Sequence, residues 1–191
     1  MFKEAISSLK LAIVTIAVCA VAYPVAILAF AAVAAPEARL GSLVLDAVGN
    51  VIGSRLIAQE FTKPEYFWPR PSACNYNAMA ACGSNLSPAN PALRERADTI
   101  LHQFGLDEDT PLPADLVTAS GGGLDPHISF AAAKVQTTRI AKARGISEGR
   151  INEVIEQHAE QIPLTSDATA RIVNVLDLNM ALDAATASAT P

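Results

Sequence analysis

The stretch Leu11–Ala35 reads LAIVTIAVCAVAYPVAILAFAAVAA and contains no charged residue. A bilayer core is about 30 Å thick, and a helix of roughly 20 apolar residues spans it. The apolar region of a cleaved secretory signal is shorter, about 7–15 residues, so a retained transmembrane helix is favoured over cleavage. Pro24 lies in the middle of this stretch, where it removes one helical hydrogen bond and is expected to kink the helix.

The charges that flank this stretch predict its orientation. Lys3 and Lys10 precede it, whereas only Arg39, beside Glu37, follows it closely. The positive-inside rule therefore predicts that residues 1–10 are cytoplasmic, that residues 11–35 span the membrane, and that the larger C-terminal part lies outside.

The rest of the chain is predicted to be one mixed α+β domain, residues 36–185, followed by a frayed tail of small polar residues, 186–191. Charged residues make up 17% of the 191 residues, against about a quarter in soluble domains, which fits a chain partly out of water. The net charge of −5 and the absence of a basic patch argue against a nucleic-acid partner.

Local patterns predict the elements of this domain. Two apolar runs within residues 42–61 meet at Gly49-Asn50, which predicts a β-hairpin with positive φ at that pair. Residues 62–91 contain five prolines and predict a long structured loop. Capping residues and apolar spacing then predict three helices: one at 91–104 between Asn90 and Gly105, one from Ser129 to about Arg144, and one after Ser147. The third has four residues on one face: Ile151, Val154, Ile155 and His158. A strand at 171–175 is predicted to lead into a last helix.

The glycine run Ser120–Gly123 raises two kinds of chemistry. Consecutive glycines expose backbone amides that can hold a phosphate, but the P-loop pattern GxxxxGK[ST] is absent, so a sharp turn is favoured. A hydrolase triad of Ser120, His127 and Asp125 lacks the GxSxG nucleophile elbow and is disfavoured. The histidines show no metal-ligand spacing, and no metal site is predicted.

The aromatic run EYFWPRPS, Glu65–Ser72, has the composition of an interface hot spot. Arg70 is expected either to stack on Trp68 or to pair with a carboxylate. An anchor that holds the long loop inside the domain is the equal alternative. Partner docking is predicted for five residues: Phe67, Trp68, Arg70, Asp125 and His127.

Two features of the loop ACGSNLSPANP, Ala81–Pro91, are ambiguous. Gly83, Ser84, Asn85 and Leu86 could surround a phosphate, but the expected lysine is missing, and such side chains commonly bond their own backbone. Cys82 lies eight residues after Cys74. The two could form a disulfide in an oxidising compartment or remain independent thiols, and both alternatives stay open.

Five segments in order resemble the C subunit of Kdp-type potassium-transporting ATPases: FTKPEYFWPRPSA, GSNLSPANP, DLVTASGGGLDPHIS, RIAKARG and VNVLDLN. The resemblance covers essentially the whole chain. It implies a single-pass protein of the bacterial inner membrane with a periplasmic domain. The implied partners are a channel-like potassium-binding subunit, a P-type ATPase subunit and a small hydrophobic subunit, besides membrane lipid.

The resemblance also implies a role without catalysis. The phosphorylated motif DKTGT of the P-type subunit is absent here. The C subunit is described as a catalytic chaperone that raises the ATP affinity of its partner. ATP and potassium would thus act at the level of the complex, with no cofactor bound directly by this chain.

The family's loop commonly reads SGGSNLGP, whereas this chain has ACGSNLSP, so only Gly83–Leu86 carry over as nucleotide-binding candidates. The predicted topology puts this loop outside, and ATP is inside, about 30 Å of hydrocarbon away. The loop is therefore expected to be structural or partner-docking. The alternative is a nucleotide-binding regulator whose domain lies in the cytoplasm.

Overall fold

The computed structural model describes residues 2–46, 48–106, 111–162, 165, 167 and 170–187. The chain divides into two compact units, Met1–Val51 and Ile52–Pro191. An apolar N-terminal helix is followed by a mixed domain of helices and strands, which confirms the predicted fold class. The predicted division at 10/11, 35/36 and 185/186 depends on the position of a membrane and stays a prediction.

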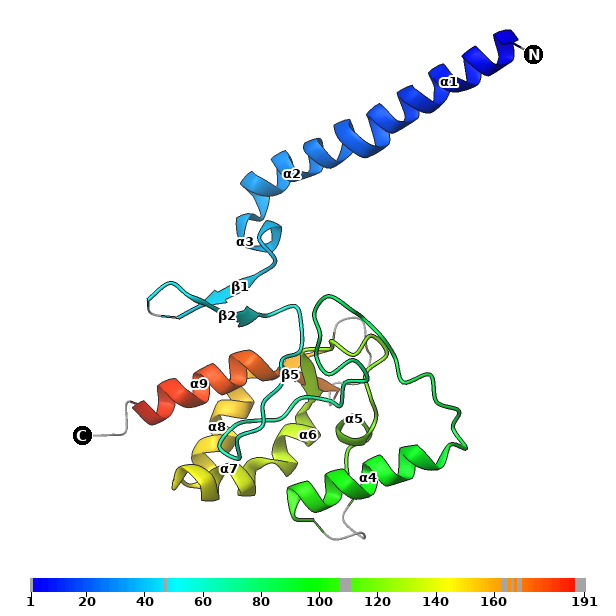
Figure 1. Ribbon diagram of the computed structural model, residues 1–191. Helices are drawn as coiled ribbons and strands as arrows, with labels where there is room; N and C mark the ends of the chain where they lie inside the picture. Colours follow the sequence, from blue (N-terminus) through cyan, green and yellow to red (C-terminus); the bar gives the residue numbers. More distant parts are fainter. Residues whose placement is uncertain are drawn as a thin grey trace. The chain divides into compact units, whose positions relative to one another are not determined.

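The first unit begins with one long helical stretch (Figure 1). It comprises α1 (Phe2–Ile16), a π-helical segment (Ala17–Ala22) and α2 (Tyr23–Ala34). Pro24 lies in the first turn of α2, and the Tyr23 N–H donates to the Val18 carbonyl five residues back. The wider π register thus falls directly before the proline, whose missing N–H interrupts the α register.

Among the described residues, Phe2–Ala34 is the one helix long and apolar enough to cross a membrane. It begins nine residues before the predicted span, because the polar N-terminal residues continue the helix. A short helix, α3 (Pro36–Arg39), follows it.

The predicted hairpin is present as β1 (Leu43–Leu45) paired with β2 (Val51–Ser54). Its turn differs from the prediction. Gly49 has φ +93°, but Asn50 is not among the described residues with positive φ. The loop is longer than two residues because the Asp46 N–H donates to the Asn50 carbonyl, while the Asp46 carboxylate accepts from the Val48 and Asn50 N–H groups.

The second unit contains a three-stranded antiparallel sheet in the order β3-β5-β4. Ile128 of β3 pairs with Val173 of β5, and Glu160 of β4 pairs with Ile172. The elements are α4 (Pro91–Phe104), α5 (Ala114–Val117), β3 (His127–Ser129), α6 (Phe130–Val135), α7 (Thr137–Arg144), α8 (Glu148–His158), β4 (Glu160–Gln161), β5 (Arg171–Asn174) and α9 (Val175–Ala187). Residues 55–90 contain neither helix nor strand. The loop predicted at 62–91 thus begins earlier, because β2 ends at Ser54 and the second apolar run does not continue as a strand to residue 61.

The helix predicted from Ser129 to Arg144 is wrong in one respect, because it is divided at Gln136 into α6 and α7. The Gln136 N–H bonds three residues back to Ala133, which tightens the chain at this point. The predicted ends are correct: Ser129 accepts from the Ala132 N–H, and Gly145 adopts φ +66°.

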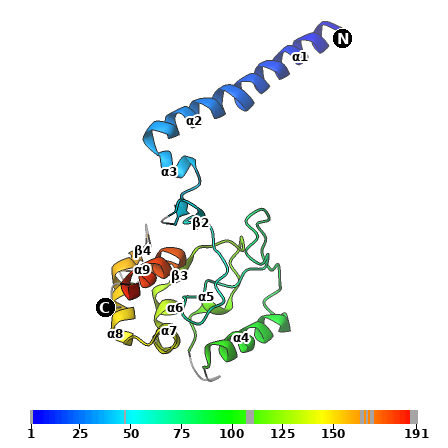
Figure 2. The same cartoon turned by 60° about the vertical axis from the view of Figure 1, so that its left-hand side comes forward.

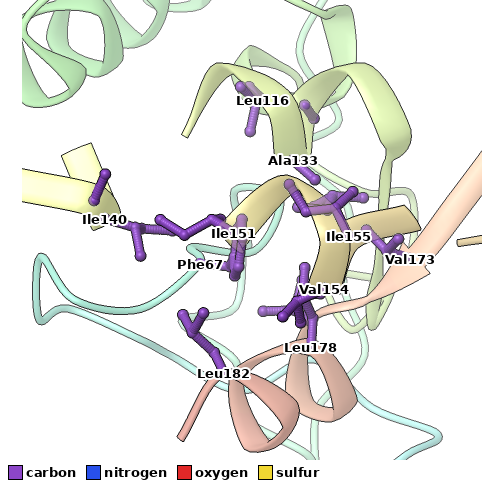
Figure 3. Packing of buried hydrophobic residues seen from close by; sticks show 14 residues of the cluster. Phe67, Leu116, Ala133, Ile140, Ile151, Val154, Ile155, Val173, Leu178 and Leu182 are labelled. Carbon is purple, nitrogen blue, oxygen red and sulfur yellow. The ribbon is translucent and has the colours of Figure 1, made fainter. Parts of the chain in front are cut away.

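The core of the second unit lies between α8, β5 and α9 (Figure 3). Ile151 and Ile155 of α8 are fully buried, as are Leu178 and Leu182 of α9. By contrast, α4 buries no residue completely, and it lies at the opposite end of the unit from α9 in both views (Figures 1 and 2). Its larger apolar side chains, which include Leu93 and Phe104, are half-buried.

Candidate functional site

Two buried amide side chains hold the aromatic segment in place. The Phe67 N–H donates to Asn179 Oδ1 (2.7 Å), and Asn179 Nδ2 donates to the Phe67 carbonyl (3.0 Å). Gln136 repeats this arrangement on Trp68, with distances of 2.8 and 3.0 Å. Each amide thus bonds both backbone groups of one residue, as a neighbouring strand would. The extended segment therefore has a fixed position without belonging to a sheet.

Phe67 and Trp68 differ in how much surface they offer. The Phe67 side chain is fully buried in the core, so in this structure it anchors the long loop and presents nothing to a partner. Trp68 is half-buried. Its ring contacts Phe104, with centroids 5.2 Å apart, and the guanidinium of Arg139, 3.8 Å from the centroid, and Arg139 lies 5.5 Å from the Phe104 centroid as well. Of the two alternatives for Arg70, the pairing with a carboxylate is the one present, since Arg70 Nη1 donates to Asp125 Oδ2, and the cation over the Trp68 ring is Arg139.

Arg139 is a half-buried cation that binds neutral acceptors. Its guanidinium donates to the Pro64 carbonyl and to Gln136 Oε1, and burial lowers its pKa to about 10. The interaction with the Trp68 ring compensates part of the lost hydration. Arg139 of α7 therefore helps to hold the aromatic segment in place.

Arg70, Asp125 and His127 come together, as three of the five predicted docking residues. Asp125 Oδ2 accepts from Arg70 Nη1 at 2.8 Å, while Asp125 Oδ1 accepts from the His127 N–H at 3.0 Å and lies 3.5 Å from His127 Nδ1. Hydrogen bonds from His127, together with those from Arg70, lower the pKa of Asp125 to about 2. All three side chains are partly exposed, which leaves this cluster accessible to a partner.

Ser120 does not join this cluster as a nucleophile. Its side chain is buried, and its hydroxyl accepts a long bond, 3.5 Å, from the Asp125 N–H. This side-chain to backbone hydrogen bond stabilises the turn between residues 120 and 125, which agrees with the preference for a turn over a hydrolase triad.

The Gly83 loop packs against the glycine run through backbone contacts. The Cys82 N–H donates to the Gly122 carbonyl (3.0 Å). A Cβ added at Gly83 would lie 2.8 Å from the Gly121 carbonyl oxygen, closer than real Cβ atoms come. The positive φ of this loop falls on Asn85 (+51°), and Asn85 is exposed, while Gly83, Ser84 and Leu86 are half-buried. Gly83 is thus required by close backbone packing.

Cys74 and Cys82 are free thiols, and both contact the glycine run. The Cys74 thiol lies 3.9 Å from the Gly122 carbonyl, to which Cys82 also bonds. The predicted choice between a disulfide and independent thiols is not decided by these contacts.

A cleft of about 370 Å³ lies between the aromatic segment and α4. Trp68, Tyr76 and Phe104 line it together with Glu60 and Leu116. Residues 83–86 do not line this cleft. Across the described ranges of the chain, no three His, Cys, Asp or Glu side chains are grouped so that they could hold a metal ion.

Sequence reasoning missed Gln136, Arg139 and Asn179. Each lies in a helical pattern, and such a pattern gives no sign of a partner more than 40 positions away. For Asn179 one signal was available, since it is a polar residue on an otherwise apolar helix face, where a buried amide needs a hydrogen-bond partner. Except for His127, which begins β3, the other candidate residues lie outside helices and strands, and their mutual contacts could not be derived from spacing.

Comparison with known proteins finds one family that matches nearly the whole chain. Residues 5–184 match the family model KdpC, described as K+-transporting ATPase, c chain. A relative from Parvibaculum lavamentivorans is 45% identical over 178 residues, 93% of this chain and 95% of the relative. One from Pseudomonas aeruginosa is 44% identical over 182 residues (95% and 97%), and one from Cereibacter sphaeroides is 47% identical over 165 residues (86% and 88%). All three relatives are named potassium-transporting ATPase KdpC subunit.

Proposed function

Because the chain belongs to the KdpC family, the c chain of K+-transporting ATPases, we propose that it assists assembly of the potassium uptake complex and raises the ATP affinity or coupling of the P-type ATPase subunit. It would have no catalytic activity of its own. Its partners would be the channel-like potassium-binding subunit, the P-type subunit and the small hydrophobic subunit.

The proposed location is the bacterial inner membrane. Residues 11–35, most of which lie in the helix Phe2–Ala34, would cross it once, with residues 1–10 in the cytoplasm and the second unit in the periplasm. Lys3 and Lys10 on the first turns of the helix support this orientation through the positive-inside rule.

The packing of the Gly83 loop is the observation that carries this proposal. Its backbone contacts the glycine run directly, which supports a structural role for this loop over an open cradle for a triphosphate. An effect on ATP would then be a coupling free energy transmitted through membrane helices, of about 1–3 kcal/mol or 5- to 150-fold in affinity.

We further propose that the Arg70–Asp125–His127 cluster docks a partner subunit. It is half-exposed, carries both signs of charge and lies on the rigid support of the amide-held segment. Trp68 would contribute the exposed edge of its ring.

The test is to measure potassium-stimulated ATP hydrolysis by the complex with and without this chain. The proposal predicts a KM for ATP that is 5- to 150-fold higher without the chain, in line with the coupling above. Asp125→Asn should weaken retention of the chain in the complex, whereas Asp98→Asn, on the exposed face of α4, should not.

An unchanged KM together with normal assembly would contradict the proposal. Photolabelling of the purified chain by an azido-ATP on residues 83–86 would instead favour the alternative of a nucleotide-binding regulator.

A further inference from the structure

Cys74 and Cys82 meet at the backbone of Gly122 and Gly123, although they lie in separate turns of the long loop. The Cys82 N–H donates to the Gly122 carbonyl at 3.0 Å, and the Cys74 thiol lies 3.9 Å from the same oxygen. The two thiols lie close enough for each to shift the pKa of the other. A single carbonyl group thus brings both residues together.

Gly123 supplies the space that the two cysteines use. It is buried with φ +71°, and a Cβ added there would lie 2.4 Å from Cys74 Sγ and 2.8 Å from the Cys82 carbonyl oxygen. The Ser72 hydroxyl donates to the Gly123 carbonyl at 2.7 Å and fixes this loop beside Cys74. Only glycine at position 123 leaves room for both cysteines to approach this backbone.

We propose that Cys74 and Cys82 are a reactive dithiol that closes to an intramolecular disulfide and covalently ties the aromatic segment to the Gly83 loop. The oxidant is a disulfide of the glutathione class or of a thiol oxidoreductase. One thiolate attacks the oxidant and releases one thiol, and the second thiolate attacks the mixed disulfide and releases the other. The protein loses two protons and two electrons, and the oxidant is reduced to two thiols.

The surroundings assign an order to these steps. Ser72 Oγ lies 3.4 Å from Cys74 Sγ, and its hydroxyl can turn from the Gly123 carbonyl to donate to the Cys74 thiolate, which lowers the pKa of Cys74, whereas burial and the Cys74 neighbour raise the pKa of Cys82. The thiolate is the nucleophile, so Cys74 attacks the oxidant and Cys82 resolves the mixed disulfide. Cys19, in the π segment, has no such partner within the part of the chain that the structure describes and serves as an internal reference.

The experiment treats the purified full chain in detergent with oxidised glutathione, alkylates the remaining thiols and maps them by peptide mass spectrometry. This readout requires neither the partner subunits nor a known topology, so its failure is distinct from failure of the proposed function. We expect one peptide that holds Cys74 and Cys82 and has lost two hydrogens. Cys82→Ser should accumulate glutathione on Cys74, and Cys74→Ser should react more slowly at Cys82.

The oxidised chain should also unfold less readily than the reduced chain, with an unfolding equilibrium constant lower by on the order of 10- to 100-fold for so short a loop. Both thiols remaining open to alkylation, stable glutathione on both cysteines, or disulfides between chains would each overturn the proposal.

Discussion

Asp125 connects three separated parts of the second unit at the scale of single residues. Its carboxylate binds the Arg70 guanidinium of the long loop and the His127 backbone at the start of β3, while its own N–H reaches Ser120 of the glycine run. A charged acceptor with several donors contributes more than a neutral one, and its loss leaves those donors without a partner.

We predict that Asp125→Asn lowers the free energy of unfolding by about 1–2 kcal/mol at pH 7, a figure reduced for the partial exposure of the ion pair. The folded pKa, about 2, lies below the ordinary value of 3.8, so the contribution is complete above pH 4 and is lost as the pH falls from 4 to 2. Denaturant titrations at several pH values measure this, with Asp98→Asn as control. A difference that persists unchanged at pH 2 would contradict the explanation.

Gly83 offers a second prediction at this scale, with a matched control in the loop that it contacts. A Cβ at Gly83 would meet the Gly121 carbonyl oxygen at 2.8 Å, whereas a Cβ at Gly121 would meet nothing within 4 Å. Gly83→Ala should therefore cost about 1–3 kcal/mol through overpacking. Gly121→Ala should stay within about 0.5 kcal/mol. Thermal unfolding compares the two variants, and equal Tm values would show that the loops do not pack in this way.

Single residues were also where sequence reasoning was most reliable. Asn90, Ser129 and Ser147 were predicted as caps, and each accepts a hydrogen bond from the first turn of its helix. A cap depends on neighbours only three residues away, so its signal is contained in the local sequence. The partner of Arg70 lies 55 residues away, and the sequence left open whether it would be a ring or a carboxylate.

At the scale of elements, two helical amides position a segment that has no regular structure. Asn179 of α9 and Gln136 between α6 and α7 are both buried and occupy the backbone groups of Phe67 and Trp68. The division of the predicted helix at Gln136 follows from this role, because the turn places its amide against Trp68. Periodicity describes a helix from its own sequence and contains no information on such a distant acceptor.

We predict that Asn179→Ala and Gln136→Ala each destabilise the second unit by about 2–4 kcal/mol, because each leaves a buried N–H and C=O of the long loop unpaired. Gln157→Ala, on the exposed side of α8, should change stability by less than about 0.5 kcal/mol. Chemical denaturation gives these values, and Trp68 fluorescence reports whether the aromatic segment detaches. A loss as small as that of Gln157→Ala would contradict the anchoring role.

At the scale of the whole molecule, the chain combines an apolar helix, Phe2–Ala34, with a mixed unit that belongs to a subunit of a potassium-transporting ATPase. The class of each part was predictable, because an uncharged stretch and capped helices are strong local signals. The packing of the Gly83 loop on the glycine run was not, since it depends on backbone contacts between segments about 40 residues apart.

We propose that the Gly83 loop lies on the side of the membrane away from ATP. The most direct measurement fuses a reporter that is active only in the periplasm after Pro191, with a cytoplasm-active reporter at the same position as its counterpart. We predict activity from the periplasmic reporter alone, which would require long-range coupling to ATP. Activity from the cytoplasmic reporter alone would contradict the orientation inferred from Lys3 and Lys10 and would make direct nucleotide contact by residues 83–86 the favoured mechanism.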